Sequence, residues 1–145
     1  MTNRYKQIIL EALSKVVSEH GYLTFYENRD INERALTHRL AFYLECSGYF
    51  SGYQVDCEYN RYEEKKKRNI SGVLIYPDIL VHIRGVQEGN LIIIQAKKFN
   101  DDDTEIKKAK KDLVNDKFFL KYQHAFLVIF PESTDQLTGK LVLKV

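Results

Sequence analysis

The chain has 145 residues, of which 44% are hydrophobic and 29% are charged. This size and composition exclude a disordered chain and are typical of one globular domain with a single core. The net charge of +2 excludes a surface that is basic throughout, so a nucleic-acid partner would need a local patch of positive charge.

The N-terminal residues contain no apolar stretch typical of a signal peptide, and no apolar run has the length of a membrane-spanning helix. The two cysteines, Cys46 and Cys57, fall inside predicted elements and are expected to be reduced core residues rather than disulfide partners. The expectation is a soluble, cytoplasmic protein with no membrane partner.

Two helices are predicted before the first strand. Apolar residues recur at helical spacing over residues 5–17, and Gly21 follows as a stop signal. A second helix is predicted from about residue 30 to residue 46. On this helix Glu33 shares one face with Leu36, Leu40 and Leu44. A carboxylate at the edge of an apolar face is either a functional group or a first-turn acid that the helix dipole favours.

Three strands are predicted next, over residues 53–59, 74–83 and 91–96. The third is apolar on both faces until Gln95, which is typical of a central strand covered on both sides. A tight Gly89-Asn90 connection predicts that the last two strands form an antiparallel hairpin.

The remaining residues predict one more helix and two more strands. The polar cluster over residues 100–103 is a candidate cap for a helix over residues 103–120. Strands are predicted over residues 124–130 and, more shortly, near the C-terminus.

A single domain is predicted because neither repeats nor linkers interrupt the chain. It would comprise a helical extension over residues 1–28, a core over residues 29–131 and a terminal strand within residues 138–145. The predicted fold class is α/β, with a mixed central sheet flanked by helices.

The predicted hairpin carries a carboxylate on one strand and an amide and an ammonium group on the other. Gln95 and Lys97 are two residues apart and share a face, and Asp78 can face them if the register permits. Hydrolysis of a phosphodiester needs a divalent ion, oxygen ligands for it and a cation near the developing charge. Asp78 and Gln95 offer the oxygen atoms and Lys97 offers the cation.

Pro77-Asp78 and Gln95-Ala96-Lys97 resemble the signature of the PD-(D/E)xK nuclease superfamily. In that family an aspartate, often after a proline, begins one strand, and an acid-x-lysine triplet lies on the next. The predicted order of elements is similar to its restriction-endonuclease-like αβββαβ core. Gln95 replaces the usual acid and removes a negative charge, as in the similar Mrr-type nucleases.

The resemblance implies a nuclease that hydrolyses DNA, or alternatively RNA, with Mg²⁺ or Mn²⁺ as cofactor. It implies that Asp78 and Gln95 ligate the ion, that Glu33 acts through a metal-bound water, and that Lys97 steadies the transition state. A homodimer or a separate recognition protein is an expected partner. The alternative is an inactive nuclease-like module that binds nucleic acid or a protein.

Other residues keep simpler interpretations open. Asp78 could merely follow a proline turn, and Lys97 and Lys98 could be a solvated strand end. Asp56 is expected to face solvent, and Glu58 is a reserve metal ligand. His82 and Arg84 share a strand with Asp78 and would contact either phosphate or solvent.

Two basic clusters are candidates for nucleic-acid contacts, although charge runs are more often only solvated faces. One cluster lies between the first two strands, and the other lies on the exposed side of the third helix near the candidate site. The candidate residues are Lys65, Lys66, Lys67 and Arg68 in the first cluster, and Lys107, Lys108 and Lys111 in the second.

Overall fold

The computed structural model describes residues 2–20, 29–58, 77–98, 102–132 and 134–145. Within these ranges the chain forms three α-helices: α1 (Thr2–Glu19), α3 (Arg29–Cys46) and α4 (Asp103–Phe119). It also forms five strands: β1 (Gln54–Cys57), β2 (Ile79–His82), β3 (Ile92–Lys98), β4 (His124–Phe130) and β5 (Val142–Lys144). The predicted α/β class with a mixed sheet is confirmed.

The strands form one sheet in the order β1-β2-β3-β4-β5. Neighbouring strands are antiparallel except for β3 and β4, which run parallel and are joined through α4. The prediction of a central third strand is confirmed, since β3 has two strands on each side and Ile92, Ile93 and Ile94 are buried.

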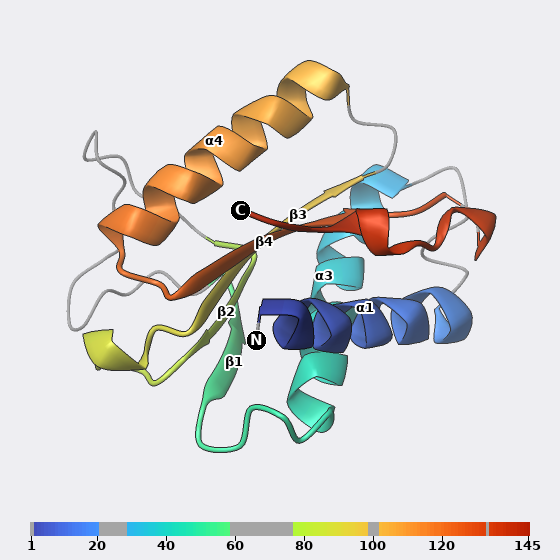
Figure 1. Cartoon of the computed structure of the whole chain (residues 1–145). Coiled ribbons are helices and arrows are strands. Elements are labelled where there is room, and N and C mark those ends of the chain that lie inside the picture. The colour runs from blue at the N-terminus through green and yellow to red at the C-terminus, as the bar shows by residue number, and fades with distance from the viewer. Residues whose placement is uncertain (1, 21–28, 59–76, 99–101, 133) are drawn as a thin grey trace.

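The helices lie on opposite faces of the sheet, with α1 and α3 on one side and α4 on the other (Figure 1). Successive residues of a strand point to opposite faces. On β3, Ile94 and Ala96 accordingly pack with α1 and α3, whereas Ile93 packs with α4. This alternation determines which layer each polar residue at the end of β3 faces.

The predicted N-terminal cap of the helix over residues 103–120, which is α4, is confirmed. The side chain of Asp102 accepts a hydrogen bond from the backbone N–H of Glu105 at 2.8 Å, which satisfies one of the free donors at the start of α4. Acidic Asp103 and Glu105 in the first turn complement the helix dipole. Helix α4 ends at Phe119, one residue earlier than predicted.

The antiparallel pairing of β2 and β3 is confirmed, but the tight Gly89-Asn90 turn is wrong. The chain instead passes through Gly85, at a φ of 76°, and then a 3₁₀ turn over Gln87–Gly89. Gly89 is needed for packing, because a Cβ atom there would lie 2.6 Å from Cβ of Ile83.

The expectation that both cysteines belong to the core is wrong, because Cys46 and Cys57 are exposed. Cys46 is the last residue of α3 and lies off the buried leucine face, and Cys57 ends β1, which is the first strand in the sheet order. Among the described residues, none of the helices has the length and apolarity needed to cross a bilayer.

Candidate functional site

Asp78 is held at the point where β2 begins. The last pair between β2 and β3 is Ile79 with Ile94, and beyond it the Asp78 carboxylate accepts a hydrogen bond from the N–H of Ala96 at 2.7 Å. On its other side, the backbone oxygen of Asp78 accepts a hydrogen bond from the N–H of Glu58 at 3.1 Å. Because both neighbouring strands hold it, the carboxylate has a defined position beside β3.

The surroundings of Asp78 favour its neutral form more than water would. The pKa of this carboxyl is raised to about 6, chiefly by burial and to a smaller extent by the negative charges of Glu33 and Glu58. The hydrogen bond from Ala96 and the positive charge of Lys97 act in the opposite direction. A buried acid that titrates near neutral pH is a candidate functional group.

A pocket of about 460 Å³ lies between α3 and the start of β2. Three carboxylates face it, and two of them already have basic neighbours. Glu33 lies 3.7 Å from the ammonium group of Lys98, and Glu58 lies 3.4 Å from the guanidinium of Arg34. The lining residues are Glu33, Arg34, Thr37, His38, Cys57, Glu58 and Asp78.

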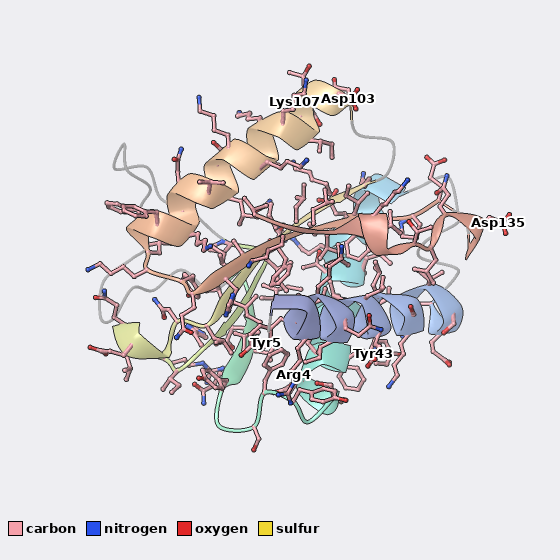
Figure 2. All side chains as sticks on the ribbon, viewed as in Figure 1. Arg4, Tyr5, Tyr43, Asp103, Lys107 and Asp135 are labelled. Carbon is pink, nitrogen blue, oxygen red and sulfur yellow. The ribbon has the colours of Figure 1, made fainter. Side chains whose placement is uncertain are left out.

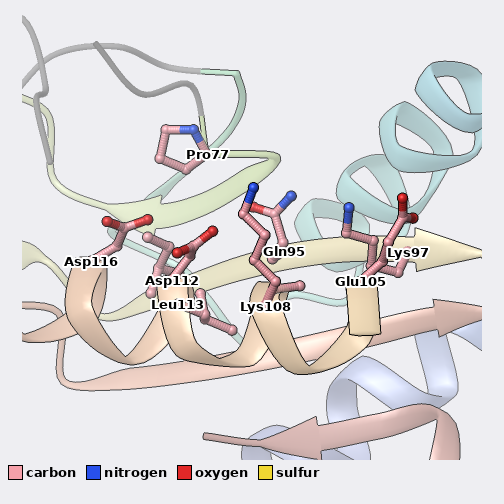
Figure 3. Close-up of a pocket in the computed structure, with 10 residues that line it drawn as sticks. Pro77, Gln95, Lys97, Glu105, Lys108, Asp112, Leu113 and Asp116 are labelled. Atoms are coloured by element: carbon pink, nitrogen blue, oxygen red, sulfur yellow. The ribbon is translucent and has the colours of Figure 1, made fainter. Parts of the chain in front are cut away.

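A second pocket, of about 340 Å³, lies on the opposite face of the sheet (Figure 3). Gln95 and Lys97 project from β3 into it, so the prediction that they share a face is confirmed. Helix α4 supplies the other wall, including Glu105, Lys108 and Asp116. Burial, followed by the nearby charge of Asp112, raises the pKa of Asp116 to about 6.

Asp78, Gln95 and Lys97, which were expected to share one pocket, thus line two different pockets. Asp78 lines the pocket on the α3 side, with Glu33, whereas Gln95 and Lys97 line the pocket on the α4 side. The cause is the alternation along β3, which directs these two side chains away from α3. Lys97 nevertheless remains close enough for its charge to lower the pKa of Asp78.

Two basic residues beside the Asp78 pocket, Lys98 and Arg34, were not predicted to take part in the site. Lys98 is two residues beyond Ala96 and shares its face, so strand alternation could have identified it as the lysine on the α3 side. Arg34 adjoins Glu33 in the first part of α3, but no spacing pattern marked it as a partner of Glu58. Glu58, the reserve ligand, does line the same pocket as Asp78.

The donors around the Asp78 pocket match a hard divalent ion in their chemistry. Carboxylate oxygens are the ligands that Mg²⁺ and Mn²⁺ prefer. In the ranges that the structure describes, however, no three acidic, histidine or cysteine side chains are grouped as a ready metal site. Binding would require Glu33 or Glu58 to leave its basic neighbour and turn toward Asp78.

The expected exposure of Asp56 is wrong, because it belongs to a polar cluster on β1 and β2. His82 is buried, and its Nε2 lies 2.8 Å from Oδ2 of Asp56. Arg84 donates to both carboxylate oxygens of Asp56, and these hydrogen bonds lower its pKa against the effect of burial. His82 and Arg84, which were expected to contact phosphate or solvent, thus both contact the carboxylate of Asp56.

The candidate basic clusters have different outcomes. Lys65, Lys66, Lys67 and Arg68 lie outside the described residues. Lys107, Lys108 and Lys111 are exposed on α4, as expected, and Lys108 also lines the pocket on the α4 side.

Comparisons of the chain with protein-family models, with curated proteins and with solved structures found no significant match.

Proposed function

We propose that the chain is a metal-dependent nuclease related to the PD-(D/E)xK superfamily. The observation that carries the proposal is Asp78: a partly buried carboxylate, with a pKa raised to about 6, beside Glu33 and Glu58 in one pocket. The order of α3, three antiparallel strands, α4 and a parallel strand supports it, because this order resembles the core of that superfamily.

The proposed ligands for Mg²⁺ or Mn²⁺ are Asp78 and Glu33, with Glu58 as a third carboxylate. Gln95 is left out of this set because it lines the other pocket. When bound, such an ion supplies charge neutralisation and a more acidic water at the scissile phosphate.

The proposed contribution of the basic residues is electrostatic. The charge of Lys97 already acts on Asp78, so we propose that it also acts on a phosphate bound beside that carboxylate. Lys98 would orient Glu33 through the ion pair at 3.7 Å. The substrate is proposed to be DNA, with RNA as the alternative, and recognition of a target would involve a second copy or a separate protein.

Cleavage assays with purified protein test this proposal. Plasmid DNA, short single-stranded DNA and RNA are incubated with Mg²⁺, Mn²⁺ or EDTA. The wild type should cut at least one substrate only when a divalent ion is present, and Asp78→Ala should abolish cutting while nucleic-acid binding persists. Cutting by Asp78→Ala at the wild-type rate would refute the assignment of this residue.

A binding module that does not cut is the second candidate. It is favoured by the ion pairs that already occupy Glu33 and Glu58, and by the position of Gln95 and Lys97 in the opposite pocket. Such a protein would be inert with every ion and substrate, and its nucleic-acid affinity would not respond to Mg²⁺.

A further inference from the structure

The side of α4 that faces away from the sheet carries exposed basic and apolar residues that the proposed site does not use. Their spacing of three or four residues places them on one face of the helix. Phe118 is 87% exposed and Val114 is 48% exposed. We call this face the α4 stripe, and its residues are Lys107, Lys111, Val114 and Phe118.

The α4 stripe is not required for the fold. The helix already buries a different face, on which Ala109 and Leu113 pack together with Ile93 and Leu127 of the sheet. Figure 2 shows Lys107 at the N-terminal end of α4, at the periphery of the molecule. An aromatic ring as exposed as that of Phe118 contributes little to stability, so its substitution should leave the fold intact.

The charges of α4 are divided between two flanks of the helix. The acids Glu105, Asp112 and Asp116 line the pocket that faces β3. The α4 stripe has lysines, and helical spacing places exposed Lys110 beside it. Asp103, in the first turn, is the acidic exception on this side. The outward flank is therefore basic although the chain as a whole is nearly neutral.

We infer that the α4 stripe binds single-stranded nucleic acid, with its lysines at the phosphates and the Phe118 ring stacked on a base. An exposed ring on a basic helix face is the combination that single-strand binding proteins use, because unpaired bases offer a free face.

This inference rests on the proposed function, which names nucleic acid as the partner. It adds that the bound nucleic acid is single-stranded and that Phe118 contacts it. It places the binding surface on the side of α4 opposite the sheet. Binding there does not require the metal ion, so it can be measured separately from cleavage.

Fluorescence anisotropy of a short labelled oligothymidylate in EDTA tests the inference. Phe118→Ala should weaken binding by roughly fivefold or more, and Phe118→Tyr should restore it, because the ring is what stacks. Phe42→Ala removes another exposed phenylalanine, at 43% exposure on α3, and should bind as the wild type does. Lys111→Gln should reduce the slope of log affinity against log salt by about 0.7.

Equal binding by Phe118→Ala, Phe42→Ala and the wild type would overturn the inference, as would absence of single-strand binding in the wild type. It would also be overturned by sedimentation data in which the wild type is a dimer that Phe118→Ala dissociates, since a second copy would then cover the stripe. Binding through Phe118 without cleavage would instead refute only the proposed enzymatic activity.

Discussion

The carboxylate of Asp78 accepts a hydrogen bond from the backbone N–H of Ala96 at 2.7 Å, one position beyond the last strand pair. A side chain thereby replaces the backbone acceptor that a longer β2 would present to β3. The same contact holds a partly buried carboxylate in the pocket that Glu33 and Glu58 also line, where the charge of Lys97 acts on it as well. Both the fold and the proposed chemistry depend on this position.

Replacement of Asp78 by asparagine should stabilise the protein at about pH 8 but not at about pH 4. The folded-state pKa, about 6, exceeds the ordinary value of 3.8, so the folded state binds more protons than the unfolded state between those values. Wild-type stability therefore falls as the pH rises through this interval. Asparagine carries no charge to bury and retains an oxygen that can accept the hydrogen bond from Ala96. The expected gain in the free energy of unfolding is up to about 3 kcal/mol.

Urea denaturation of the wild type and Asp78→Asn at the two pH values measures this gain. Asp135→Asn, a change at an exposed carboxylate in the C-terminal part, serves as the control. A gain that is the same at both pH values would show that ionisation of Asp78 is not its source.

The two neighbouring lysines of β3 should have separable effects. Lys98→Ala removes the partner of Glu33, so it should change the metal dependence of cleavage more than its maximal rate. Lys97→Ala removes the charge proposed to act at the phosphate, and it should lower the maximal rate by roughly 100-fold or more at saturating metal. Rates measured across an Mn²⁺ series distinguish the two, and identical profiles would argue against the division of roles.

Gly89→Ala should destabilise the fold by about 1–3 kcal/mol, because the new Cβ would lie 2.6 Å from Cβ of Ile83. Gly139→Ala is the matched control, since a Cβ there meets nothing within 4 Å. Thermal unfolding of both variants tests the β2–β3 connection. If Gly89→Ala were as stable as the wild type, the connection between β2 and β3 would have to be packed differently.

Asp56→Asn should destabilise the fold by about 1–3 kcal/mol near neutral pH, because buried His82 and exposed Arg84 lose the charge of their shared acceptor. The folded-state pKa of Asp56 is lowered, chiefly by the hydrogen bonds from Arg84. Its stabilising effect is thus complete above the ordinary pKa and is lost as the pH falls through the folded-state value. Denaturation at about pH 7 and about pH 3 should show the difference from wild type shrinking in acid.

Patterns of short range predicted most of the fold. Helical spacing identified α1 and α3, the polar cluster before α4 contained its cap at Asp102, and the apolar run of β3 indicated its central place. Each of these features depends on residues within a few positions of one another. The exposure of Cys46 escaped prediction because a helical position does not reveal which face the rest of the chain covers.

The candidate site was predicted only in part, because it depends on how separate strands meet. Alternation placed Gln95 and Lys97 on one face, but it could not give the side of Asp78, which precedes the first paired residue of β2. The same alternation, applied one residue further, would have placed Lys98 on the face of the sheet that α3 and Glu33 cover. The polar cluster of Asp56, His82 and Arg84 could not be predicted without knowing that β1 pairs with β2.

Calorimetric titration with Mn²⁺ tests the central claim, that Asp78 anchors a divalent-ion site, most directly. The wild type should bind the ion at about pH 7.5 and more weakly at about pH 5.5, where a proton competes for a carboxyl of pKa about 6. Asp78→Asn should bind at least about tenfold more weakly, as expected for the loss of a charged ligand. Equal affinity of wild type and Asp78→Asn for Mn²⁺ would contradict the account.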